Sequence, residues 1–419
     1  MKYPQRSQIS LHFNCCKRWS QTGQYNIGSS AGSSCCFLSA SRAVFSSLAT
    51  HSQLTPFNAT MAGMCFAKLL MILAAVSPLF AAATPATSLL VLDKRDTALV
   101  IVDPTSLQIV AKMPSGPDPH EVAVSSDGTT AYISNYGGTG SPYHTISVVD
   151  LIKQKALPPI DLGPMHSAHG LDFAAGKLYF TAETNKVIGT YDPATKKIDW
   201  VLGTGQNRTH MVTVRAAGKQ IFTSNVNSDT ISIIEPNTSP NNFGPPPGGG
   251  PGGPPPGGPP PGGPPPGPRI PDWQETPVKV GQGPEGFDVS PSGKELWAAN
   301  SHDGSISIID VASKKVIQTI NAKVESSNRL KFTLDGKYAL VSSLRNGDLA
   351  IFDAADRKEI KRLKLGRGAA GILMRPDNQI AYVACSPDNY VAVIDLKTLS
   401  VVNKIKPGQE PDGMAWAVR

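Results

Sequence analysis

Cysteine is almost absent from the larger part of this sequence. The cysteines that precede residue 84 are Cys15, Cys16, Cys35, Cys36 and Cys65. Only Cys385 follows them, and one cysteine cannot form an internal disulfide bond. Residues 84–419 must therefore be stabilised by packing. We expect Cys385 to be a small buried strand residue, because free cysteine is among the most buried residue types.

Acidic residues are missing from residues 1–83, which contain six Lys and Arg residues. The rest of the chain contains 33 basic and 32 acidic residues, so most of the formal net charge of +7 belongs to the N-terminal segment. No general attraction to phosphate follows for the remainder, and we expect no nucleic-acid partner.

Long hydrophobic runs are also missing, which excludes a polytopic membrane protein. The apolar run LLMILAAVSPLF at 69–80 is short for a membrane span. It follows Lys68 and precedes three alanines that end at Ala83, which is the layout of a secretory signal peptide cleaved after Ala83. We predict a signal peptide at 61–83 and a secreted protein, periplasmic or extracellular, with no membrane span in the mature chain.

Signal peptides stand at the start of a chain, but this one begins at residue 61. We interpret residues 1–60 as a mis-assigned, disordered leader, with translation starting at Met61 or Met64. The alternative is an organelle transit segment, because 1–60 is rich in serine, contains arginine and lacks acids. A transit segment would leave the signal peptide behind it unexplained.

A repeat organises the chain after residue 84. Seven short β-rich runs each end in an acidic residue: LVIVD, ISVVD, VIGTYD, ISIIE, ISIID, LAIFD and VAVID, ending at Asp103, Asp150, Asp192, Glu235, Asp310, Asp353 and Asp395. Most of these runs are spaced by just over 40 residues. One interval is much longer, and it contains the stretch 244–268, which is glycine and proline throughout. Removing this insertion restores the period.

Each repeat contains four short β-rich segments joined by turns such as Asp127-Gly128 and Ser292-Gly293. Four antiparallel strands per repeat of this length are typical of a β-propeller blade. The chain enters the repeats at 88–93 with the pattern of a second strand and leaves around Trp416 with that of a first strand. We therefore predict an all-β, seven-bladed propeller over 84–419, in which the C-terminal strand is the innermost strand of the blade formed by the N-terminal strands.

Two repeats contain closely matching motifs: Tyr132-Ile133-Ser134-Asn135 followed by Ile146-Ser147-Val148-Val149-Asp150, and Trp297-Ala298-Ala299-Asn300 followed by Ile306-Ser307-Ile308-Ile309-Asp310. On these motifs the repeats resemble the YVTN-type β-propeller family. The resemblance covers 88–419 apart from the insertion. Proteins with this architecture include cell-surface binding proteins, lactonases and haem-carrying domains of nitrite reductases. Because one fold supports many functions, the resemblance implies the fold more strongly than the activity.

The glycine- and proline-rich insertion lies at 236–272, between the third and fourth strands of one blade. It has no strict Gly-X-Y period and cannot bury apolar surface, so we expect a disordered loop rather than a collagen helix or a domain. It would serve as a proline-rich ligand or a tether, or it is a repeat expansion tolerated at a surface hairpin.

Several recurring residues have structural explanations. The aspartates that end the third strands are expected to cap the following turns through side-chain to backbone hydrogen bonds. Trp273, Trp297 and Trp416 fall at strand positions and are expected to pack between blades.

Histidines are the clearest candidates for a functional site. The six that follow residue 84 are His120, His144, His166, His169, His210 and His302. In blade coordinates His144 and His302 lie in turns from second to third strands, and the others lie in links to an innermost strand. These two loop classes share one face of a propeller, so we expect all six histidines on that face.

Three of these histidines occupy one repeat position at the start of the innermost strand. The same position in the other blades holds Glu285, Asn328, Ala370 and Asp412. We predict that His120, His169, His210, Glu285, Asn328 and Asp412 rim the central channel and bind a ligand. His120, His169, His210 and Glu285 are a donor set suited to a divalent metal such as zinc, copper or iron. Alternatively, the imidazoles hydrogen-bond neighbouring loops.

Two functional hypotheses follow. In the first, the protein is a monomeric, secreted binding scaffold whose His-bearing face recognises a small molecule, a glycan or a protein. In the second, it is a metal- or cofactor-dependent enzyme, a lactone hydrolase or an oxidoreductase, with its site at the channel mouth. No Gly-x-Ser-x-Gly motif supports a serine hydrolase, and no Cys-x-x-Cys-His motif supports covalent haem attachment.

Overall fold

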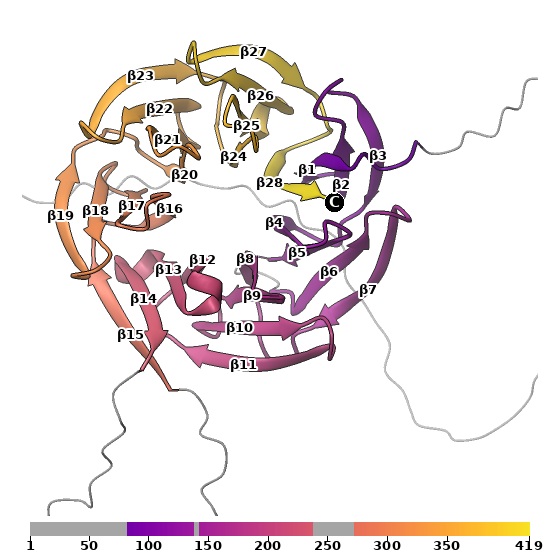
Figure 1. Cartoon of the computed structure of the whole chain (residues 1–419), viewed down its shortest axis with the longest axis horizontal. Helices are drawn as coiled ribbons and strands as arrows, with labels where there is room; N and C mark the ends of the chain where they lie inside the picture. Colours follow the sequence, from indigo (N-terminus) through magenta and orange to yellow (C-terminus); the bar gives the residue numbers. More distant parts are fainter. Residues whose placement is uncertain (1–81, 138–141, 238–271) are drawn as a thin grey trace, which may run out of the picture. The chain divides into compact units, whose positions relative to one another are not determined.

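The computed structural model describes residues 82–137, 142–237 and 272–419. These residues form seven four-stranded antiparallel sheets arranged in a ring, with short 3-10 helices as the only helical elements (Figure 1). The predicted all-β, seven-bladed propeller is therefore confirmed. Within these ranges, no helix has the length and hydrophobicity needed to span a membrane.

The blades are numbered 1 to 7 in ring order, and each has the same order of strands from the axis outwards. The innermost strands are β28 (Pro411–Val418), β4 (Pro119–Val124), β8 (Ala168–Ala174), β12 (Thr209–Arg215), β16 (Pro284–Val289), β20 (Ser327–Phe332) and β24 (Ile372–Met374). The second strands are β1 (Thr87–Asp93), β5 (Thr130–Asn135), β9 (Lys177–Ala182), β13 (Gln220–Asn225), β17 (Glu295–Asn300), β21 (Tyr338–Ser343) and β25 (Ile380–Cys385).

The two outer positions of each blade complete the sheets. The third strands are β2 (Ala98–Val102), β6 (Thr145–Asp150), β10 (Val187–Asp192), β14 (Thr230–Pro236), β18 (Ile306–Asp310), β22 (Asp348–Asp353) and β26 (Tyr390–Asp395). The outermost strands are β3 (Ile109–Pro114), β7 (Lys155–Asp161), β11 (Lys197–Gly203), β15 (Trp273–Lys279), β19 (Lys315–Ile320), β23 (Lys358–Lys364) and β27 (Ser400–Ile405). The 3-10 turns are η1 (Ala216–Gly218), η2 (Val226–Ser228) and η3 (Ser386–Asp388).

The two ends of the propeller close blade 1. Strand β28 pairs antiparallel with β1, with Trp416 opposite Leu89 and Ala415 opposite Leu90. The C-terminal strand therefore takes the innermost position of a blade whose other strands come from the start of the propeller, as predicted. Closure removes the unpaired strand edges that an open stack of sheets would expose.

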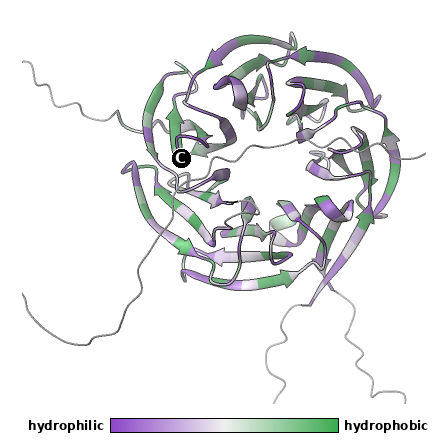
Figure 2. Ribbon diagram, turned by 180° about the vertical axis from the view of Figure 1, so that it is seen from behind, coloured by the Kyte–Doolittle hydropathy of each residue, from purple (hydrophilic) through white to green (hydrophobic). Residues whose placement is uncertain are grey.

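The hydrophobic core lies between the blades. Seven clusters of buried residues each join two neighbouring blades; one, for example, packs Leu90 and Ile101 of blade 1 against Ile133 and Val149 of blade 2. Each fully buried Leu, Ile or Val side chain contributes roughly 1.5–3 kcal/mol of transfer free energy. The outermost strands alternate between hydrophilic and hydrophobic segments, as expected for strands with one face in solvent (Figure 2).

The predicted tryptophan contacts are confirmed. Trp297 in blade 5 packs edge-on against Phe332 in blade 6, with ring centroids 5.4 Å apart. Trp416 in blade 1 packs against Tyr382 in blade 7, and Trp273 in blade 4 packs against Trp200 in blade 3.

The predicted aspartate caps of the turns after the third strands are confirmed. The Asp103 carboxylate accepts hydrogen bonds from the backbone N–H groups of Thr105 and Ser106. The equivalent caps are formed by Asp150, Asp192, Asp310, Asp353 and Asp395. Cys385 is fully buried in β25, as expected.

Some predictions concern residues outside the described ranges. The leader at 1–60 lies there, as does the signal peptide at 61–83 except for its last two residues. The insertion joins β14 to β15, the third and fourth strands of blade 4, but residues 238–271 within it are not described.

Candidate functional site

A cavity of about 340 Å³ opens at the mouth of the central channel. All seven positions that the repeat predicted to rim the channel line this cavity. They are His120, His169, His210, Glu285, Asn328, Ala370 and Asp412. In six blades this residue is the second residue of the innermost strand. In blade 7 it is Ala370, which precedes β24. The structure therefore places equivalent repeat positions from seven different blades around one cavity.

A backbone irregularity directs these side chains into the channel. In β4, His120 and Glu121 together lie opposite Ser134 alone, which is a β-bulge. The bulge recurs at His120–Glu121, His169–Gly170, His210–Met211, Glu285–Gly286, Asn328–Arg329 and Asp412–Gly413. A bulge re-aims side chains that would otherwise alternate between the two faces of a sheet.

Hydroxyl groups on the second strands hold the bulges in place. Thr181 Oγ1 accepts a hydrogen bond from the Gly170 N–H of its own blade and donates one to the His210 carbonyl of the next blade. Ser224 and Ser342 make the equivalent pairs of contacts in blades 4 and 6. These hydroxyls therefore connect adjacent inner strands at the level of the cavity.

Glycine after the cavity-lining residue allows neighbouring inner strands to approach closely. A Cβ atom on Gly170 would lie 2.6 Å from the carbonyl oxygen of His210. A Cβ atom on Gly413 would lie 2.3 Å from the carbonyl oxygen of His120. Both separations are shorter than a van der Waals contact, so only glycine fits without displacing the neighbouring strand.

The polar side chains contact one another in the order of the blades. Nδ1 of His120 lies 3.7 Å from Oδ2 of Asp412, and the His120 ring centroid lies 5.0 Å from that of His169. The rings of His169 and His210 are 3.8 Å apart, and Nε2 of His210 lies 2.7 Å from Oε2 of Glu285. Side chains from five consecutive blades thus form a continuous row.

His210 lies between two carboxylates. Its Nδ1 contacts Glu183 and its Nε2 contacts Glu285, while the imidazole itself is 2% exposed. Burial by itself would lower the pKa of His210, but the charge of Glu285 and the hydrogen bonds to both carboxylates raise that pKa to about 9. The same pairing lowers the pKa of Glu285 to about 2, despite its burial. At neutral pH His210 is an imidazolium ion with both N–H groups donating.

His169 is held in the opposite protonation state. Burial, reinforced by the electrostatic effect of the neighbouring His210, lowers the pKa of His169 well below its ordinary value. Its Nδ1 is buried and has no hydrogen-bond partner. A buried polar atom without a partner costs about 1–3 kcal/mol, so this nitrogen is a ligand-binding candidate.

His120 has a different environment. Its Nε2 lies 3.2 Å from Asp118, and its Nδ1 lies 3.5 Å from the ammonium group of Lys94. The hydrogen bond with His120 lowers the pKa of Asp118. The rings of His120, Tyr136 and His169 form a near-equilateral triangle with centroid separations of 4.9, 5.0 and 5.1 Å.

Two arginines complete the cavity. Arg208 reaches Glu183 through Nε at 3.5 Å and Glu285 through a terminal nitrogen at 3.2 Å. Arg329 extends from blade 6 across the channel and pairs with Glu121 of blade 2. The Arg329 side chain is 6% exposed.

The repeat did not reveal several residues of the site. Glu183 follows β9, Tyr136 follows β5 and Arg208 precedes β12. A signal for Glu183 was present in the sequence: the second strands of blades 2, 4 and 5 end in asparagine, whereas β9 ends at Ala182 and is followed by the acidic Glu183. Glu183 is part of a compact donor set, since one ligand atom from each of His169, Glu183 and His210 lies within 4.8 Å of the others.

The remaining histidines lie away from this cavity. His144 and His166 contact each other, with ring centroids 5.7 Å apart, so the two loop classes that carry them do meet on one face. His302 packs beside Gly283, where a Cβ atom would be 2.6 Å from the imidazole. None of these three lines the channel mouth.

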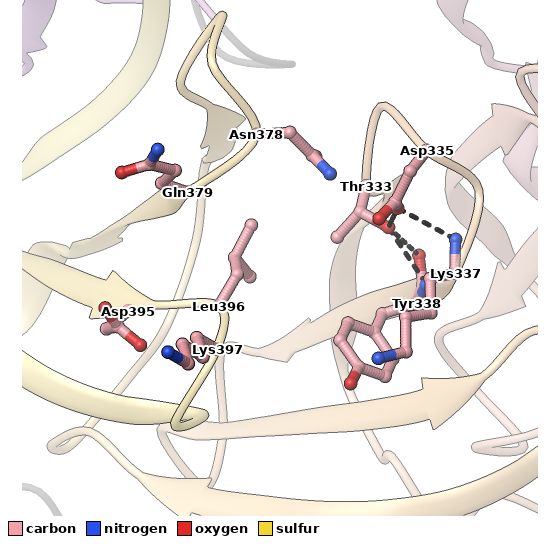
Figure 3. Close-up of a pocket in the computed structure, with 9 residues that line it drawn as sticks. All are labelled: Thr333, Asp335, Lys337, Tyr338, Asn378, Gln379, Asp395, Leu396 and Lys397. Carbon is pink, nitrogen blue, oxygen red and sulfur yellow. Dashed lines mark hydrogen bonds between the residues drawn. The ribbon is translucent and has the colours of Figure 1, made fainter.

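A second hollow of about 520 Å³ lies between the hairpin turns of blades 6 and 7 (Figure 3). Its polar groups are largely satisfied within one turn: Asp335 accepts hydrogen bonds from the Thr333 hydroxyl and the Lys337 N–H. It shares no residue with the channel mouth, and it contains no histidine.

Comparison with known proteins identifies the fold. No family model and no curated protein matches the sequence. A solved structure of a protein of unknown function from Desulfotomaculum acetoxidans matches with a TM-score of 0.59 and 11% identity, covering 79% of this chain and 99% of that one. A candidate 6-phosphogluconolactonase from Bacteroides uniformis matches with a TM-score of 0.60 and 14% identity, over 79% of this chain and 99% of that one.

The hydrazine synthase of Kuenenia stuttgartiensis matches with a TM-score of 0.54 and 18% identity, over 72% of this chain and 90% of that one. At these identities the three structures show a common propeller fold and nothing about activity.

Proposed function

We propose that this protein is a secreted β-propeller of the YVTN type that binds a small polar molecule at the channel mouth. The observation that carries the proposal is the pair of buried, unpartnered polar atoms, His169 Nδ1 and Asn328 Oδ1, on two residues that line one cavity. A ligand that supplied hydrogen bonds to them would remove the cost of leaving them unpaired.

The size and charge of the cavity indicate the class of ligand. A volume of about 340 Å³ lies within the range of small-molecule sites. Its lining combines the cations Lys94, Arg208 and Arg329 with the anions Glu285, Glu410 and Asp412. Because both signs are present, the lining favours a compact molecule rich in hydroxyl groups, such as a monosaccharide or a hydroxy acid.

Secretion is supported by the signal-peptide pattern at 61–83. The hydroxyl of Thr84, the residue after the expected cleavage site, donates to the carbonyl of Leu151 in blade 2. A mature chain starting at Thr84 would retain this contact. N-terminal sequencing of the exported protein tests the cleavage site, and an N-terminus far from Thr84 would contradict it.

Calorimetric titration with monosaccharides, hydroxy acids and their lactones tests the binding function. Asn328→Ala removes one cavity acceptor and is expected to weaken binding at least tenfold. His144→Ala, on the same face but outside the cavity, is the matched control and should bind normally. Binding by none of these compounds, or equal binding by both variants, would reject the proposal.

A lactone hydrolase is the second candidate. It is favoured by His169, a neutral imidazole beside the cationic groups of Arg208 and His210, which together resemble a general base next to groups that stabilise an oxyanion. The Bacteroides uniformis neighbour bears a related activity name. Titration of acid released from gluconolactone separates the two: catalysed release that His169→Gln abolishes would establish the enzyme.

A further inference from the structure

We infer that His169, Glu183 and His210 form a site for a divalent transition-metal ion at one side of the channel mouth. One ligand atom from each of the three lies within 4.8 Å of the other two. This set differs from the one expected from the repeat, because Glu183 enters it and His120 and Glu285 leave it. The inference concerns the same cavity as the proposed function: an ion at Nδ1 of His169 would replace the hydrogen bond expected there from the small polar ligand, whereas Asn328 would remain free for that ligand.

His169 supplies the first ligand. Its side chain is almost fully buried, it lines the cavity, and its Nδ1 contacts no hydrogen-bond partner. A neutral imidazole nitrogen with a free lone pair is the form in which histidine binds a metal. Because Nδ1 of His169 makes no hydrogen bond in the structure, a metal ion could bind to it without breaking one.

Glu183 and His210 supply the other two ligands. Nδ1 of His210 now donates a hydrogen bond to Oε1 of Glu183. An ion would take the place of the shared proton, which is released to solvent, and the two groups would each donate a lone pair to the metal. Oε1 is the free ligand atom of Glu183, because Tyr136 and Arg208 both contact Oε2, at 2.7 and 3.5 Å.

Glu285 takes an orienting role. Its Oε2 lies 2.7 Å from Nε2 of His210, the nitrogen that would face away from the ion. A carboxylate on the far nitrogen of a metal-binding histidine fixes the tautomer and raises the basicity of the ligand. Oε1 of Glu285 is held by Arg208 at 3.2 Å. Both oxygens are therefore already engaged, as expected for a residue outside the metal's own ligand set.

His120 is not expected to bind the metal ion, because both of its ring nitrogens face other polar groups. Its two nitrogens face Asp118 on one side and Lys94 and Asp412 on the other. The ammonium group of Lys94, 3.5 Å from Nδ1, would repel a metal ion at that nitrogen. His120 instead packs its ring against His169 and Tyr136.

Two imidazoles and one carboxylate define the metal class. This donor set suits zinc in a site whose fourth position is open to the cavity, and it also suits other divalent first-row ions. Magnesium and calcium prefer six or more oxygen ligands and are not expected to bind. The open position would face the space in which a ligand of the cavity lies.

Titration of the chelator-treated protein with Co²⁺ tests the site. Tetrahedral Co²⁺ bound to nitrogen and oxygen ligands absorbs visible light, so the spectrum reports the ligand set directly. We expect one equivalent of Co²⁺ to bind and one equivalent of Zn²⁺ to displace it, with Mg²⁺ having no effect. Absence of a visible spectrum at millimolar Co²⁺ would overturn the inference.

Three variants assign the ligands. Glu183→Gln is expected to weaken Zn²⁺ binding by at least ~100-fold, whereas Glu285→Gln weakens it roughly 10- to 100-fold and retains the Co²⁺ spectrum. His144→Gln, outside the cavity, is the matched control and should leave both unchanged, and His120→Gln should retain the Co²⁺ spectrum. Loss of binding in His120→Gln, or its retention in Glu183→Gln, would overturn the assignment. Circular dichroism verifies that each variant is folded, and His169→Asn replaces Glu183→Gln if the latter is not.

Discussion

Arg329 in β20 pairs across the channel with Glu121 in β4, a residue 208 positions away in the sequence. The two strands belong to blades 6 and 2, which are not neighbours in the ring. Both residues sit at the second position of a bulge, and both side chains are largely shielded from solvent. The ion pair therefore connects inner strands from opposite sides of the propeller.

Removing one member of this pair is expected to be costly. Arg329→Met leaves Glu121 as an uncompensated buried charge and should lower the free energy of unfolding by about 3–5 kcal/mol. The double variant Glu121→Gln with Arg329→Met should recover most of that loss, because no buried charge remains. Urea denaturation measures both. Equal destabilisation in the single and double variants would show that the arginine acts through packing alone.

Asp93 is expected to make stability depend on pH. It is fully buried at the end of β1, with Lys112 Nζ 3.2 Å from one carboxylate oxygen. Burial outweighs that ion pair and raises the pKa of Asp93 from 3.8 to about 6. Between these values the folded state binds more protons than the unfolded state, so stability falls as the pH rises through this window and is constant above it.

The Asp93→Asn variant isolates this effect. Relative to the variant, the wild-type protein should lose about 2 kcal/mol of unfolding free energy between pH 4 and pH 7. Urea titrations of both proteins at several pH values give the difference directly. Parallel stability curves for the two proteins would mean that Asp93 titrates normally in the folded state.

The hydrogen bonds of the Thr181 hydroxyl are expected to contribute to the stability of the propeller beyond the packing of the side chain. Thr181→Val keeps the shape of the side chain but leaves the Gly170 N–H and the His210 carbonyl without their present partner. We expect a loss of about 1–3 kcal/mol in unfolding free energy. Thr195→Val, in an exposed turn, is the matched control and should be neutral. A neutral Thr181→Val would indicate that the bulge does not need the hydroxyl.

Cys385 is expected to be unreactive in the folded protein. Its side chain is fully buried, and burial raises the pKa of its thiol to about 11. Because the thiolate is the reactive species, a thiol reagent should label this cysteine only after denaturant is added. Rapid labelling of the native propeller at Cys385, located by peptide mass analysis, would contradict the packing of β25.

The sequence by itself determined the number of blades, the order of their strands and the closure of the ring. Each blade must bury its two faces against neighbours, so the same hydrophobic pattern recurs at a constant period and can be counted. The count also aligned His120, His169 and His210 with Glu285 and Asp412, because equivalent repeat positions meet at the axis of a closed ring.

Only the tertiary structure decided what those side chains contact. His210 obtains one of its carboxylates from Glu183, and Arg329 obtains its partner from the far side of the channel. The bulges that turn these side chains inward depend on hydrogen bonds between blades, such as that from Thr181 to His210. Protonation follows from the same contacts: burial keeps His169 neutral, while two carboxylates keep His210 charged. A repeat pattern specifies equivalent positions, but the differences between their environments arise only when the ring closes and brings unlike residues together.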